Sequence, residues 1–177
     1  WSVFSGANLS KYLIAESRKG GKAAVFLKPC DSYSFVQLLK EHRILRETVY
    51  AVGVQCDGMC DMEAIKELGL AGVTAVTEDG EDLRVSTIYG ERTIKKADAL
   101  LLKCKTCKSK KLVCFDELLG AQGEENPDCG RFAEVEKLES MTAEERYTFW
   151  RSELSRCIRC NACRNVCPAC SCEKCVF

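Results

Sequence analysis

The sequence predicts an α/β domain with a small parallel or mixed sheet, followed by a helix and a ferredoxin-like, cysteine-rich tail. Three observations support this class. Two short apolar runs flank an amphipathic stretch, an Asp-Gly pair lies between two β-prone runs, and seven of the fourteen cysteines fall between Cys157 and Cys175. We place the α/β domain in residues 1–118, a linker in residues 119–140, and the helix with the cysteine motif in residues 141–177.

Residues 23–27 and 49–54 are the predicted strands of a βαβ unit. Both are short apolar runs, which is typical of buried strands, and the stretch between them has helical periodicity with Asp31 or Ser32 as the expected N-cap. A strand, helix and strand within about 30 residues favour a parallel pair. His42, the single histidine, lies on the apolar face of this predicted helix, so we expect it to be packed and not a metal ligand.

A β-hairpin is predicted where residues 73–77 and 83–88 flank Asp79-Gly80, because Asp-Gly between β-prone runs favours a tight turn. The other predicted elements are a short helix within residues 1–21, a helix at 62–68, a strand at 97–102, and a helix that follows a capping box at 142–145.

The tail from Cys157 to Pro168 reads C-x2-C-x2-C-x3-C-P. Closely spaced thiolates on a tight loop can bind three corners of an iron–sulfur cube, and this spacing is that of bacterial ferredoxins. The sequence therefore predicts a 4Fe-4S cluster on Cys157, Cys160 and Cys163. The fourth thiolate would come from outside the tail or from the remaining tail cysteines, which are Cys167, Cys170, Cys172 and Cys175. Zinc and disulfide bonds are the alternatives, but zinc sites usually use two separated cysteine pairs.

A second cluster is predicted at the edge of the sheet. Cys30 and Cys56 each follow a strand of the same βαβ unit, and parallel strands open their carboxyl ends on one edge. Another apolar run leads into Cys104 and Cys107, so we expect four thiols to converge, with Cys60 as a substitute. The alternatives are cysteines that act as small buried apolar residues, a redox dithiol, or half a zinc site.

Charge and composition limit the function classes. Lys plus Arg and Asp plus Glu both number 26, so nothing favours nucleic acid or an acidic membrane as a partner, and no apolar run approaches the length of a membrane span. The cysteines are clustered and not spread along loops, which favours a reducing, cytoplasmic location. Five lysines surround Cys104 and Cys107 and would offset the charge of a thiolate cluster or attract an acidic partner: Lys103, Lys105, Lys108, Lys110 and Lys111.

Residues 28–31, 52–58 and 104–107 together resemble the core of the deazaflavin-coenzyme hydrogenase/dehydrogenase beta-subunit family. Residues 156–175 are similar to a ferredoxin-type iron–sulfur subgroup found beside hydrogenase, formate dehydrogenase and heterodisulfide-reductase-like subunits. The resemblance covers roughly residues 20–175. It implies electron relay through 4Fe-4S clusters, with a flavin nearby in the complex and with such redox subunits or a flavoprotein as partners.

We expect a non-catalytic electron-transfer subunit of a larger redox complex, without catalytic residues of its own. Family members that act on the deazaflavin usually carry the cysteine motif before the core, whereas here it follows the core. The alternatives are a flavin- or deazaflavin-dependent oxidoreductase beta subunit and a structural zinc-binding interaction module. Because the chain starts at Trp1 and stops at Phe177 before a second cysteine motif, we expect the native protein to extend further.

Overall fold

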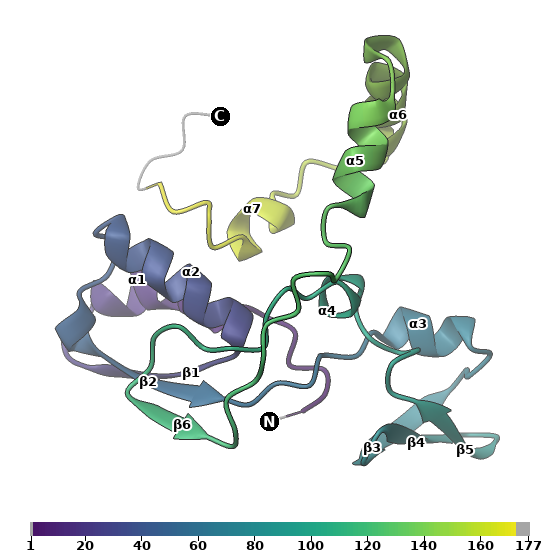
Figure 1. The fold of residues 1–177 in the computed structure, drawn as a ribbon, viewed down its shortest axis with the longest axis horizontal. Coiled ribbons are helices and arrows are strands. Elements are labelled where there is room, and N and C mark those ends of the chain that lie inside the picture. Colours follow the sequence, from purple (N-terminus) through teal and green to yellow (C-terminus); the bar gives the residue numbers. More distant parts are fainter. Residues whose placement is uncertain (1, 173–177) are drawn as a thin grey trace.

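The computed structural model describes residues 2–172 and contains two separate three-stranded sheets (Figure 1). The first is parallel, in the order β1-β2-β6, and its strands are β1 (Ala23–Leu27), β2 (Val49–Val54) and β6 (Glu117–Leu119). The second is antiparallel, in the order β3-β4-β5, with β3 (Val73–Asp79), β4 (Asp82–Thr87) and β5 (Gly90–Lys95). The chain is therefore α/β as predicted, but the hairpin forms its own sheet and does not extend the parallel one.

The parallel sheet is covered by helices α1 (Leu13–Ser17) and α2 (Pro29–Lys40), which lie on the same side of it in Figure 1. The βαβ prediction is confirmed, since β1 and β2 pair in parallel with Leu27 beside Gly53. Side chains from the strands and helices form one apolar core that includes Leu27, Phe35, Leu38 and Ala51, all fully buried. The 3-10 helices η1 (Leu9–Tyr12) and η2 (Arg46–Thr48) precede α1 and β2.

Helix α2 begins earlier than the sequence predicted. Its N-cap is Lys28 and not Asp31 or Ser32, because Pro29 already has the φ angle that the first helical residue needs. Asp31 is instead the third helical residue, where its carboxylate accepts the Lys28 N–H. The prediction of a packed histidine is wrong: α2 ends at Lys40, and His42 lies beyond it, exposed, with a left-handed φ of 52°.

The antiparallel sheet forms a second unit with its own core. The predicted hairpin is confirmed, with Asp79 opposite Asp82 and Gly80 at a φ of 62° in the two-residue loop. Helix α3 (Met62–Glu67), also predicted, packs against this sheet through Ile65. Other fully buried members of this core are Leu83, Val85 and Ala99.

Residues 97–102 do not form the predicted strand. Residues 96–99 are a turn, Leu100 makes a single antiparallel bridge to Cys60, and helix α4 (Leu102–Lys105) follows at once. The apolar character of this stretch comes from packing instead, since Ala99 is buried in the second core.

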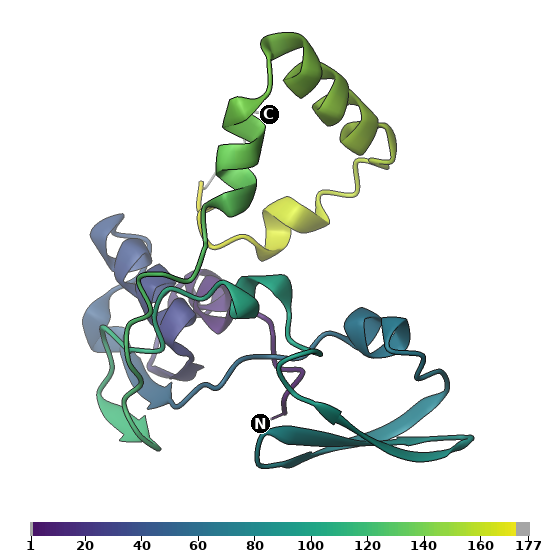
Figure 2. The same ribbon diagram turned by 45° about the vertical axis from the view of Figure 1, so that its right-hand side comes forward.

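Within the segment 119–140, residues just after β6 fold back, and the Lys110 N–H donates to the Glu124 carbonyl at 2.9 Å. Helices α5 (Ala133–Ser140) and α6 (Ala143–Ser155) then extend together away from both sheets (Figures 1 and 2). The capping box of α6 is confirmed at Thr142 and Glu145. Within residues 2–172, no helix combines the length and apolar character that crossing a bilayer requires.

Candidate cysteine site

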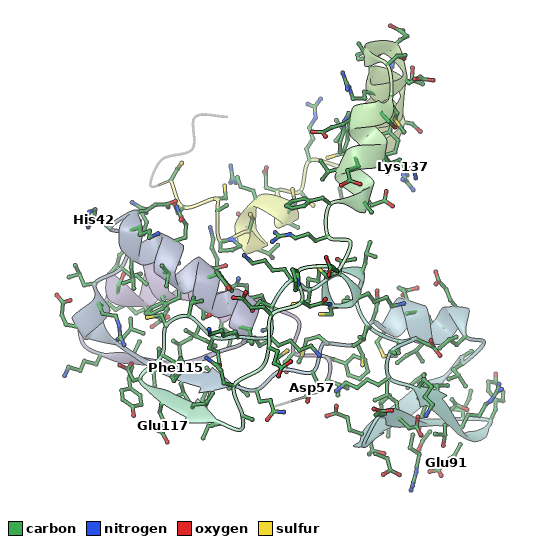
Figure 3. All side chains as sticks on the ribbon, viewed as in Figure 1. His42, Asp57, Glu91, Phe115, Glu117 and Lys137 are labelled. Carbon is green, nitrogen blue, oxygen red and sulfur yellow. The ribbon has the colours of Figure 1, made fainter. Side chains whose placement is uncertain are left out.

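Four cysteines from three separate segments line one pocket between the two sheets. Cys30 lies in the first turn of α2, Cys56 follows β2, Cys104 lies in α4, and Cys107 comes directly after α4. Figure 3 shows sulfur atoms in this central region, close to α4. The predicted convergence of these four residues is therefore present, although α4 and not a strand brings in the last two.

The backbone positions these side chains for clear physical reasons. The carboxyl ends of β1 and β2 meet at one edge of the parallel sheet, which places Cys30 and Cys56 beside each other. Helix α4 is tied to the same edge because the Leu101 N–H donates to the Met59 carbonyl at 2.8 Å. The loop after β2 is thus hydrogen-bonded to the residue that precedes α4, the helix that carries Cys104.

Gly58 allows this close approach. Its φ of +102° is a conformation that L side chains rarely adopt, and a Cβ there would lie 2.7 Å from Leu100 Cδ2. The turn directs two backbone donors at sulfur: the Gly58 N–H at Cys56, and the Met59 N–H at Cys104 Sγ at 3.4 Å. Hydrogen bonds to the ligating sulfurs are one of the means by which proteins adjust iron–sulfur clusters.

The electrostatics of the pocket oppose free thiolates. Desolvation by the surrounding protein, and after it the negative charge of Asp31, raise the pKa of the Cys30 thiol to about 12. Burial also raises the pKa of Cys56, against the opposing effect of the Gly58 N–H. Without a cation these thiols stay protonated at neutral pH, whereas a bound metal deprotonates a coordinating thiol.

Three lysines line the pocket and counter this effect. Lys28 lowers the pKa values of both Cys30 and Cys56, although in each case burial outweighs it. Lys103 and Lys110 come from the predicted lysine run. The sequence interpretation missed Lys28, and the signal that could have found it is its position between β1 and Cys30.

The rest of the lysine run has other contacts. Lys105 donates to the Asp98 carbonyl at 3.1 Å, and the Lys108 ammonium lies 4.7 Å from the centre of the Tyr33 ring. The run is therefore not a single patch around the cysteines.

Cys60, the expected substitute ligand, is not at the pocket. It is buried in the second core, and its backbone N–H donates to the Val3 carbonyl at 2.7 Å. Cys114 packs against the first core, and Cys129 is half-buried before α5.

The described residues contain no group of three or more His, Cys, Asp or Glu side chains close enough to hold a single metal ion. Four thiols line the pocket, and backbone N–H groups face two of them, which is the donor chemistry that a 4Fe-4S cluster uses.

The tail contains a short helix, α7 (Ala162–Val166). Left-handed residues Arg159 and Asn161 turn the loop, and the Arg159 N–H donates to Cys157 Sγ at 3.4 Å. The predicted ligands Cys157, Cys160, Cys163, Cys167 and Cys172 are exposed and Cys170 is half-buried, while Cys175 lies outside the described residues.

Beyond α7 the tail contacts the part of the chain built on the parallel sheet, beside α2 (Figure 1). The Lys11 ammonium donates to the Cys170 carbonyl, and the Ser171 hydroxyl donates to the Glu41 carboxylate at 2.6 Å. Hydrogen bonds from Gln37 and Ser171 lower the pKa of Glu41, which remains ionised as the acceptor.

Comparison with known proteins adds a relationship to this geometry. The chain is similar to beta subunits of F420-dependent formate dehydrogenase. It is 24% identical over 235 residues to the beta subunit of F420-dependent formate dehydrogenase 1 of Methanococcus maripaludis, covering 93% of this chain and 58% of the relative. It is 25% identical over 220 residues to the beta subunit of Methanocaldococcus jannaschii, covering 92% and 58%. No family model matches the chain.

The chain thus spans a little over half the length of the curated relatives that it matches. The similarity supports the predicted relationship to deazaflavin-linked dehydrogenase beta subunits. The narrower assignment to a 4Fe-4S subgroup stays a prediction.

Proposed function

We propose that this chain is an electron-transfer subunit of a larger oxidoreductase complex, with one 4Fe-4S cluster in the pocket and another in the tail. The observation that carries the proposal is the convergence of four thiols from three separate segments, Cys30, Cys56, Cys104 and Cys107, in a single pocket. Backbone N–H groups directed at two of the sulfurs support it.

Within this proposal a bound cluster supplies the capacity to accept and release single electrons. The protein's own residues hold it and adjust it. The four cysteines of the pocket bind iron, the loop at Gly58 and Met59 donates hydrogen bonds to sulfur, and the pocket lysines offset negative charge.

The tail cluster rests on the sequence spacing of its cysteines. Cys157, Cys160 and Cys163 are the proposed ligands. The fourth ligand comes from the group of Cys167, Cys170, Cys172 and Cys175 or from a partner chain.

The partners proposed are other redox subunits. Both relatives are named as beta subunits of formate dehydrogenase, which is the basis for placing this chain in a complex that exchanges electrons with a dehydrogenase, hydrogenase or heterodisulfide-reductase-like subunit.

Anaerobic purification with iron and acid-labile sulfide counts tests the proposal. We expect broad visible absorption that dithionite bleaches. The double variants Cys56→Ser/Cys104→Ser and Cys160→Ser/Cys163→Ser should each lose about half of the iron, since each removes ligands of one four-iron cluster. Cys114→Ser is the matched control and should keep its iron.

Two results would contradict the proposal. One is a colourless protein that holds only zinc, which would favour the interaction-module alternative. The other is tail cysteines that are linked to each other as disulfides in the native protein.

A second function, oxidation or reduction of a deazaflavin by the chain itself, is favoured by the F420 dependence stated in the names of both relatives. Acid extraction should then release a flavin, or the purified chain with an artificial electron donor should reduce a deazaflavin. A chain that only conducts electrons should do neither.

A further inference from the structure

We propose that the buried ion pair of Lys28 and Asp31 sets the reduction potential of the cluster in the pocket, with Lys28 raising it and Asp31 lowering it. The inference rests on the proposed function and adds a role for two residues that bind no iron. Lys28 is 2% and Asp31 1% exposed, and Lys28 lines the pocket.

The pair is fixed in place on both sides of a proposed ligand. The Lys28 ammonium lies 2.7 Å from Asp31 Oδ2 and donates to the Ala7 carbonyl at 2.6 Å. The other oxygen, Asp31 Oδ1, lies 3.7 Å from Cys30 Sγ. Cys30 lies between the two charged residues in the sequence, at the start of α2, so both charges are held near it.

Stability alone does not explain why these charges are buried. Removing two ions from water is costly, and replacing a buried pair with packed apolar side chains is often neutral or stabilising. Further along α2 the sequence uses apolar packing, as at Phe35 and Leu38. Its location gives another reason: the pair is fully buried, and Lys28 lines the cysteine pocket.

The sign of each effect follows from charge. Reduction adds an electron to the cluster, so a fixed ammonium nearby stabilises the reduced form and a fixed carboxylate destabilises it. Both groups are buried, so salt screens them far less than surface charges.

Potentiometric titration followed by electron paramagnetic resonance tests the inference. The full chain carries Cys160→Ser/Cys163→Ser so that only the pocket cluster contributes a signal. We expect Lys28→Gln to lower the midpoint potential and Asp31→Asn to raise it. The matched control is Lys22→Gln, because Lys22 is exposed and precedes β1, whereas Lys28 follows β1. The midpoint potential of the pocket cluster should not change in this control.

The outcomes separate the two proposals. If the background protein shows no pocket cluster, the proposed function fails. If the cluster is present but Lys28→Gln leaves its potential equal to that of Lys22→Gln, or raises it, the inference is overturned. If Lys28→Gln does not retain iron, Asp31→Asn decides: a higher potential supports the inference, and an unchanged or lower one overturns it.

Discussion

Replacing Gly58 with alanine should damage the pocket more than the same change elsewhere. Gly58 has a φ of +102°, and a rarely populated backbone conformation costs a residue with a side chain about 1–3 kcal/mol. The new methyl group would also lie 2.7 Å from Leu100 Cδ2, which must rotate or shift. Since Leu100 is half-buried and can partly yield, overpacking adds about 1 kcal/mol.

We therefore expect Gly58→Ala to lower the free energy of unfolding by about 3 kcal/mol. Gly69→Ala is the matched control, because Gly69 also has a positive φ, +80°, but nothing lies within 4 Å of its Cβ position. The control should lose only about 1 kcal/mol, the cost of a left-handed backbone. Urea denaturation followed by circular dichroism measures both.

Iron content provides a second measurement on the same variants. Moving Leu100 or Gly58 disturbs the N–H groups that face Cys56 and Cys104, so Gly58→Ala should also bind less iron than Gly69→Ala. Equal unfolding free energies and equal iron contents in the two variants would refute this account of the turn.

Two further predictions concern the sheet and the tail. Asp116 Oδ2 accepts the Ala51 N–H at 2.7 Å, and the other carboxylate oxygen binds Arg46. Asp116→Asn should lower the free energy of unfolding by about 1 kcal/mol at neutral pH, because solvent screens a partly exposed ion pair. These contacts lower the pKa of Asp116 in the folded state. Their stabilisation is therefore present above the ordinary carboxyl pKa of about 4 and is lost as the pH falls through the lowered value. The denaturation midpoints of the native protein and of Asp116→Asn should converge at that low pH, and a difference independent of pH would contradict this cause. Removing iron with a chelator should expose residues after α6 to limited proteolysis, because few of their side chains are buried; an unchanged digestion pattern would show that the tail folds without metal.

Local patterns were sufficient for the elements whose partners are near in sequence. The strands of the βαβ unit, the hairpin across Asp79 and Gly80, and the capping box at Thr142 follow from periodicity, turn residues and short-range hydrogen bonds. The prediction at 97–102 was wrong because an apolar run cannot distinguish a strand from a turn that packs its side chains into a core.

The position of His42 was wrong for a related reason. Helical periodicity continues through that residue in the sequence, but the helix stops at Lys40 and the chain reverses in a left-handed conformation. Helix ends depend on single-residue backbone geometry, which periodicity does not report.

By itself, the sequence predicted a thiolate-ligated site in the tail, because the spacing of Cys157, Cys160 and Cys163 is local and a ligand loop needs only local spacing. Only the tertiary structure decided how the core cysteines reach one pocket and that Cys60 stays outside it. It brought Cys104 beside Cys56 through α4 and placed Cys60 in an apolar core instead. The physical reason is that such placements depend on contacts between segments distant in sequence, as where the Leu101 N–H donates to the Met59 carbonyl, and local patterns do not report those contacts.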